Sequence, residues 1–146
     1  MPPLNPSTDP IEKCLPGQRI GFDLVKISQI ADSIDQFGDL FKNRLFTKSE
    51  LDYACSGEGM CAERLAARFA AKEAIIKALK LGNAGIGWRE IEVRKLSDGD
   101  CNVALHGQVA KLAQTMGVTK IMLSLSHDGE YAGAMVAVLF APGSVN

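Results

Sequence analysis

Apolar and polar positions between Cys61 and Leu81 follow a helical period and predict the strongest single element of this chain. The segment is rich in Ala, Leu, Lys and Glu and contains neither Pro nor Gly, a composition that favours an uninterrupted helix. Gly82 predicts the end of the helix. One stripe of the helix is apolar at helical spacing, at Leu65, Phe69, Ile76 and Leu79.

Charged side chains interrupt this apolar stripe. Lys72 and Glu73 fall inside it or at its edge, where Ala or Leu would be expected. Glu73 and Lys77 are four residues apart, so their side chains can meet on the helix surface. Because a carboxylate near a core is costly unless it is paired or bound to a metal, this part of the helix predicts a functional site.

The segments before the long helix predict a strand and two helices. Residues 20–27 suit a strand that carries Asp23 at its end and leads into a helix over residues 28–37. Thr47 and Glu50 have the spacing of a capping box, which predicts a helix running to about Cys55, before Ser56-Gly57-Glu58-Gly59 breaks it.

The segments after the long helix predict most of a sheet. In order they are a glycine-rich loop (82–87), a strand (88–96), a turn (98–100), a short strand (102–105), a helix (107–116) and two strands (120–126 and 131–140) joined as a hairpin by residues 127–130. The order predicts an α+β domain in which a mainly antiparallel sheet packs against the long helix.

Composition narrows the class of protein. The chain has 146 residues, 47% apolar and 23% charged, with a net charge of -1, which suits one soluble domain and excludes a charge-driven nucleic-acid or membrane partner. Four cysteines without C-x-x-C spacing predict reduced thiols. Since the N-terminus has no apolar signal-peptide core, we expect the cytoplasm. Residues 1–18 hold five of the six prolines and predict a flexible tail before a domain over residues 19–146.

Three segments together resemble the 4′-phosphopantetheinyl transferases, specifically the short holo-acyl-carrier-protein synthase type. The resemblance covers about Arg19 to Val138 and implies that family's fold. The segments are Gly21-Phe22-Asp23-Leu24-Val25, then Arg68-Phe69-Ala70-Ala71-Lys72-Glu73-Ala74 with Lys77, then Ser124-Leu125-Ser126-His127 with Tyr131-Ala132.

The resemblance implies a magnesium-dependent reaction. The family transfers phosphopantetheine from coenzyme A to a serine of an acyl carrier protein and releases adenosine 3′,5′-bisphosphate. Asp23 and Glu73 match the carboxylates that hold Mg²⁺, and two carboxylates plus waters suit that ion. Lys77 matches the lysine that places positive charge on the pyrophosphate. The serine proton leaves through a metal-bound water or through Glu73, and the sequence leaves both routes open.

The resemblance also implies how coenzyme A is bound. Arg68 and Lys72 match residues that hold its phosphates, and Ser126 and His127 match residues that contact it before the last strand. This type works as a homotrimer with coenzyme A between subunits. Larger relatives fuse two such halves in one chain, so a half-sized chain implies oligomerisation.

Each candidate residue also has an ordinary structural explanation. Asp23 alone suits a helix cap, Glu73 with Lys77 suits a surface ion pair, Arg68 suits a solvated face, and His106 suits the start of a helix. Two other functions stay open as alternatives: a non-catalytic binding module of the same fold, and a different magnesium-dependent phosphate enzyme. The joint presence of the motif residues argues against the first, and the lack of a second constellation argues against the second.

Several positions depart from the family pattern. Arg19 and Lys80 stand where the family often has glycine, and Lys80 predicts a longer helix and a reshaped loop. Gly99-Asp100-Cys101 replaces a Gly-Lys-Pro turn, which removes the basis for contacts from that turn.

The first predicted helix and the residues after it also depart from the pattern. This region carries Asp32, Asp35 and Asp39 where relatives often carry basic residues that receive an acidic carrier. Because like charges oppose docking, we expect a less acidic carrier, or docking through Lys42, Arg44 and Lys48. The sequence does not distinguish carriers of fatty acid, polyunsaturated fatty acid or polyketide synthesis.

Overall fold

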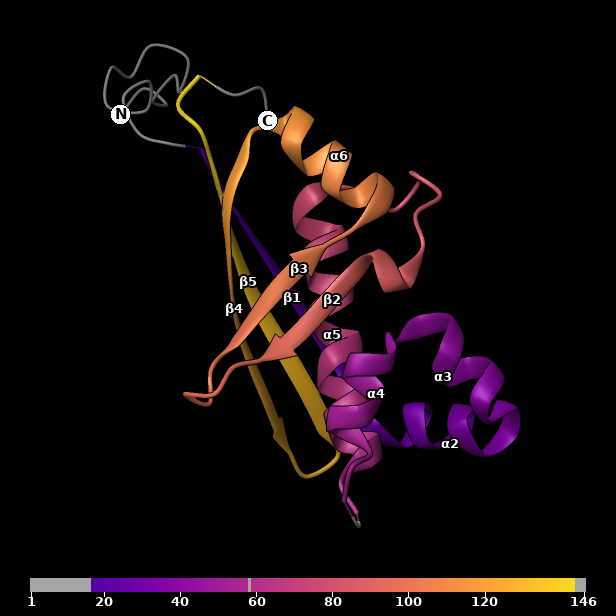
Figure 1. Ribbon diagram of the computed structural model, residues 1–146. Coiled ribbons are helices and arrows are strands. Elements are labelled where there is room, and N and C mark those ends of the chain that lie inside the picture. Colours follow the sequence, from indigo (N-terminus) through magenta and orange to yellow (C-terminus); the bar gives the residue numbers. More distant parts are fainter. Residues whose placement is uncertain (1–16, 58, 144–146) are drawn as a thin grey trace, which may run out of the picture.

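The structure is a computed structural model that describes residues 17–57 and 59–143 (Figure 1). The strands are β1 (Gln18–Lys26), β2 (Ile91–Lys95), β3 (Cys101–Leu105), β4 (Val118–Asp128) and β5 (Tyr131–Phe140). The helices are α2 (Ile27–Phe37), α3 (Asp39–Leu45), α4 (Lys48–Ala54), α5 (Cys61–Leu79), the 3₁₀ turn η2 (Trp88–Glu90) and α6 (Gly107–Met116).

The predicted α+β fold is confirmed. Three strands form an antiparallel sheet in the order β1–β5–β4, and β2 and β3 form a separate antiparallel pair. Figure 1 shows α5 running along the three-stranded sheet, and α2, α3 and α4 lie on the side of α5 that faces away from this sheet. The buried faces of α5 and β5 supply much of the hydrophobic core, which places the charged side chains of α5 at its border.

Small residues let α5 approach β1 closely. A Cβ atom at Gly21 would lie 2.0 Å from the carbonyl oxygen of Ala74 and 3.2 Å from the Cβ of Ala78. Only glycine fits this position without moving the helix. The face of α5 is correspondingly rich in buried alanine, at Ala66, Ala67, Ala70, Ala71, Ala74 and Ala78.

The longer helix predicted from Lys80 is wrong. Helix α5 ends at Leu79, and Lys80 adopts the left-handed conformation (φ 56°, ψ 46°) that a glycine would adopt. The backbone N–H of Leu81 donates to the Ile76 carbonyl over 2.9 Å, the closure typical of a helix C-terminus. The Leu81 side chain is buried in the core, and this burial stabilises the turn after α5 despite the backbone strain at Lys80.

Several predicted bounds need correction. Strand β1 begins at Gln18, so Asp23 lies in its middle and is no helix cap. Residues 88–90 form a 3₁₀ turn before strand β2, and α3, which lacks a side-chain N-cap, was not predicted. The capping box at Thr47 and Glu50 is confirmed. The predicted tail lies largely outside the described residues, although Gly17 already accepts a hydrogen bond from Phe140.

The prediction of reduced, scattered thiols is wrong for two cysteines. A disulfide joins Cys55, at the end of α4, to Cys61, the first residue of α5, with a Cα–Cα distance of 4.6 Å. The α4–α5 connection folds back and brings the two thiols together. Cys101 is a free thiol, and Cys14 lies outside the described residues. Within the described part of the chain, no helix has the length and apolar character to span a membrane.

Candidate functional site

Strand β1 and helix α5 bring Asp23 and Lys77 together. The Lys77 ammonium donates to Oδ1 of Asp23 over 2.7 Å and to the Phe22 carbonyl over 3.3 Å. The Asp23 side chain is largely enclosed, whereas half of the Lys77 side chain is exposed. The close Gly21–Ala74 contact, two residues before Asp23 and three before Lys77, fixes this distance between strand and helix.

Glu73 belongs to the same cluster of charges. Burial raises the pKa of the Glu73 carboxyl, the nearby Asp23 carboxylate raises it further, and the Lys77 ammonium partly offsets both. Hydrogen bonding to Asp23 also raises the pKa of Lys77. The lysine therefore pairs with Asp23 across the elements, rather than with Glu73 along the helix as its spacing predicted.

The two carboxylates fit a magnesium ion. Burial raises the pKa of Glu73 most and the Asp23 carboxylate raises it further, and a divalent cation between the two carboxylates would relieve their repulsion. Among the described residues, no group of three or more His, Cys, Asp or Glu side chains forms a metal cage. A pair of carboxylates is nevertheless the donor set that Mg²⁺ uses when waters and substrate phosphates complete its shell.

A second feature is a cleft of about 410 Å³ between the first turns of α5, strand β4 and the turn before β3. Three basic side chains line it, and so do the two residues that the resemblance implies for coenzyme A, Ser126 and His127. The basic residues are Arg64, Arg68 and Lys95. The cleft is therefore suited to an anionic ligand.

Arg68 is the most constrained of these side chains. Only 3% of its surface is exposed, and its guanidinium lies 4.4 Å from the centre of the Tyr53 ring. One terminal nitrogen donates to the Arg64 carbonyl over 3.3 Å, while the buried Nε has no hydrogen-bond partner among the described residues. Burial lowers the pKa of this guanidinium. A buried cation with an unused donor at a cleft is the arrangement expected for binding a phosphate.

Lys72 does not belong to the cleft or to the carboxylate cluster. Its side chain has no exposed surface, and its ammonium forms an ion pair with Glu50 over 2.7 Å. It cannot reach a phosphate from this position, so the role implied by the resemblance is wrong for this residue. The apolar stripe indicated burial for both Lys72 and Glu73, but only Lys72 is fully enclosed.

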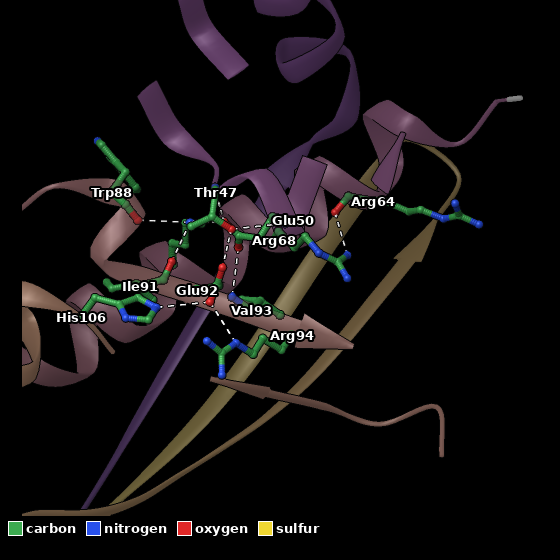
Figure 2. Close-up of polar contacts among 11 residues, drawn as sticks. Thr47, Glu50, Arg64, Arg68, Trp88, Ile91, Glu92, Val93, Arg94 and His106 are labelled. Carbon is green, nitrogen blue, oxygen red and sulfur yellow. Dashed lines mark hydrogen bonds and ion pairs between the residues drawn. The ribbon is translucent and has the colours of Figure 1, made fainter. Parts of the chain in front are cut away.

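Another carboxylate, Glu92, is structural. It accepts hydrogen bonds from Thr47 (2.6 Å) and Arg94 (2.9 Å) and lies 3.2 Å from the His106 ring, as Figure 2 shows. Burial alone would raise the pKa of Glu92, but these hydrogen bonds lower it overall. The structural role predicted for His106 is confirmed, since it stands before α6 and contacts Glu92.

Sequence reasoning missed several residues that line the cleft. Arg64 precedes Arg68 by one helical turn, so the i, i+4 spacing alone placed both on one face. Lys95 and Tyr53 come from β2 and α4, and their place at the cleft depends on packing between distant segments. No local pattern announces such a contact.

Comparison with known proteins identifies related chains. Residues 19–136 match the family model described as the 4′-phosphopantetheinyl transferase superfamily. A holo-[acyl-carrier-protein] synthase of Gloeobacter violaceus is 42% identical over 121 residues, covering 83% of this chain and 92% of that protein. One from Dehalococcoides mccartyi is 44% identical over 119 residues, covering 80% and 93%.

Solved structures agree with this assignment. An ACPS–CoA complex from Chronobacterium ammoniagenes has a TM-score of 0.75 and 34% identity, covering 86% of this chain and 98% of that one. A holo-[acyl-carrier-protein] synthase from Helicobacter pylori in complex with coenzyme A has a TM-score of 0.71 and 28% identity, covering 82% and 98%.

Proposed function

Because the chain belongs to the 4′-phosphopantetheinyl transferase superfamily, we propose that Asp23, Glu73 and Lys77 form the centre with which it transfers phosphopantetheine. The donor is coenzyme A and the acceptor is a serine of an acyl carrier protein. The observation that carries the site is the clustering of these three side chains at the β1–α5 contact.

The cluster has the charges that phosphoryl transfer needs. Asp23 and Glu73 would hold Mg²⁺, which supplies positive charge to the pyrophosphate oxygens. The exposed Lys77 ammonium, fixed by Asp23, adds a second positive charge on the same face. The serine hydroxyl proton would pass to the Glu73 carboxylate at this site or to a nearby water, and both routes stay open. Adenosine 3′,5′-bisphosphate is the leaving group.

We assign the nucleotide end of coenzyme A to the basic cleft. Arg68, with its buried Nε lacking a partner, binds a phosphate together with Arg64, while Ser126 and His127 lie on the facing strand β4. Related proteins of known structure are complexes with coenzyme A, which supports a nucleotide site in this fold.

We further propose that copies of this chain assemble as a homotrimer through the open face of the sheet. In the described part of the chain, large apolar side chains on that face are exposed: Ile20 is 72% exposed, Phe22 54%, Leu24 57% and Met135 54%. Ser124, Ser126 and His127 border both this face and the basic cleft. A second copy seated there would therefore lie beside the cleft and complete it.

Carrier docking concerns the α2–α3 region. Asp32 and Asp35 on α2 and Asp39 on α3 are exposed, and they would repel an acidic carrier helix. We propose that the preferred carrier is less acidic there, or that it docks through Lys42, Arg44 and Lys48. Transfer rates on carriers with neutralised helix charges test this: an unchanged preference would count against it. The cytoplasm stays our prediction for the location.

Intact-mass analysis tests the function. An apo acyl carrier protein is incubated with this protein, coenzyme A and Mg²⁺, and a gain of one phosphopantetheine is expected. EDTA should abolish the gain because it removes the metal ion. Glu73→Ala should abolish it because it removes a proposed metal ligand. Arg89→Ala, at an exposed position on η2, serves as the matched control and should react normally. Absence of both transfer and coenzyme A binding would refute the proposal.

A further inference from the structure

A buried ion pair joins helices α4 and α5. The side chains of Lys72 and Glu50 are both 0% exposed, and the ammonium lies 2.7 Å from Oε1 of Glu50. Lys72 also donates to the carbonyls of Trp88 (3.1 Å) and Ile91 (2.6 Å). An ammonium has three protons to donate, so these three acceptors use its whole capacity.

Glu50 extends the same network to two further backbone groups. Its Oε1 accepts from the N–H of Thr47 over 2.9 Å, and its Oε2 accepts from the N–H of Val93 over 3.0 Å. Figure 2 shows these contacts converging from α4, α5 and strand β2. We call Glu50 and Lys72, with the four backbone groups they hold, the α4–α5 lock.

The α4–α5 lock holds α5 in place through Lys72, which precedes Glu73. Strand β1 holds it through Ala74, which follows Glu73. Lys72, Glu73 and Ala74 are consecutive, and successive side chains on a helix are separated by about 100°. Lys72 is tied to η2 and β2, whereas Ala74 abuts Gly21 of β1. Rotation of α5 about its axis would break the hydrogen bonds of Lys72 or push Ala74 against Gly21.

We propose that Lys72 and Glu50 are positioning residues that keep the Glu73 carboxylate directed toward Asp23. The inference deepens the proposed function, because it rests on Glu73 serving as a metal ligand there. Stability alone does not require this network: hydrophobic pairs of similar volume often replace buried ion pairs without loss. What a hydrophobic pair cannot reproduce is the set of directed bonds to Trp88, Ile91, Thr47 and Val93.

The test is a double variant, Glu50→Leu with Lys72→Met, which leaves neither charge unpaired in the core. We expect it to fold, as judged by cooperative urea unfolding, but to bind Mn²⁺ on the order of tenfold more weakly by electron paramagnetic resonance. In the transfer assay, kcat should fall by a similar factor. The KM for coenzyme A should change less, because the bond from Arg68 to the Arg64 carbonyl lies within α5 and does not depend on the lock.

Two further variants sharpen the result. Lys111→Met removes an exposed lysine on α6 and is the matched control, which should match the wild type in both assays. Glu50→Gln combined with Lys72→Met also leaves no charge in the core and keeps one acceptor at position 50, so it is the second variant if the first does not fold, and it should show the same effects in smaller degree.

The outcomes separate this inference from the proposed function. A folded double variant with wild-type Mn²⁺ affinity and wild-type kcat overturns the role of the lock. If the wild-type protein transfers nothing to any carrier, the proposed function fails. The Mn²⁺ titration then still decides whether the lock positions the carboxylates.

Discussion

The contact between Gly21 and Ala74 gives the most direct test of how the fold builds its site. Gly21→Ala adds one methyl group on β1, facing the backbone of α5. That methyl carbon would lie 2.0 Å from the Ala74 carbonyl oxygen and 2.9 Å from the Ala74 carbonyl carbon. Backbone atoms inside a helix cannot rotate away as a side chain can, so the helix itself must shift.

The size of the shift follows from these distances. The distance from a Cβ atom to another heavy atom essentially never falls below 3.0 Å. The distance from the new Cβ at position 21 to the Ala74 carbonyl oxygen must therefore increase by about 1 Å from 2.0 Å. Overpacking on this scale costs about 1–3 kcal/mol of stability. The same movement separates Glu73 and Lys77 on α5 from Asp23 on β1. A misplacement of about 1 Å can lower a reaction rate by about 100-fold.

Two measurements check this prediction. Urea unfolding should show a lower midpoint for Gly21→Ala, and the intact-mass assay should show a loss of rate larger than the loss of folded protein explains. Gly82→Ala is the control, since a Cβ there meets nothing within 4 Å. If Gly21→Ala matched the wild type in both assays, the close strand–helix contact would not set the geometry of the site.

Further predictions follow from charge, covalent structure and exposed surface. Because the pKa of Glu73 is raised in the folded state, its ionisation destabilises the metal-free protein. Glu73→Gln should therefore unfold at higher urea than the wild type at pH 7, and the difference should vanish below the ordinary glutamate pKa of 4.5. Arg68→Met should raise the KM for coenzyme A by about tenfold or more, since a charged hydrogen bond contributes about 1.5–3 kcal/mol; an unchanged KM would remove Arg68 from the nucleotide site. Reduction of the disulfide between Cys55 and Cys61, six residues apart, should lower the unfolding free energy by about 2 kcal/mol, and Cys55→Ser should then be insensitive to dithiothreitol. Phe22→Glu should yield monomers by light scattering, and a trimer that persists would place the interface elsewhere.

The sequence carried the elements whose signals are local. The period of α5, the capping box at Thr47 and the hairpin before Tyr131 each depend on neighbours a few residues away, and each is confirmed. The sequence does not predict helix α3, because this helix is short and begins after Gly38 without a side-chain cap. The sequence does not predict the left-handed backbone of Lys80, because the burial of Leu81 sets this conformation against the usual backbone preference of lysine.

The candidate site was predictable only in part, for the same reason. The motif positions named Asp23, Glu73 and Lys77, and the structure brings them together. The periodicity of α5 gave no means of separating Lys72 from Glu73, because the difference lies in what faces each residue. Lys72 meets Glu50, which is distant in sequence and itself buried, and such a partner is visible only once the chain is folded.

Among the described residues, α5 covers one side of the three-stranded sheet, and large apolar side chains are exposed on the other. In the trimer that we propose, protein concentration becomes a variable of the enzyme. In that trimer, another copy would cover side chains such as Phe22 and Met135, so association and stability would obey mass action. Specific activity should then fall on dilution below the dissociation constant and recover on concentration. Variants of the outer sheet face would be rescued by raising the amount of protein, whereas variants of Asp23 or Glu73 would not.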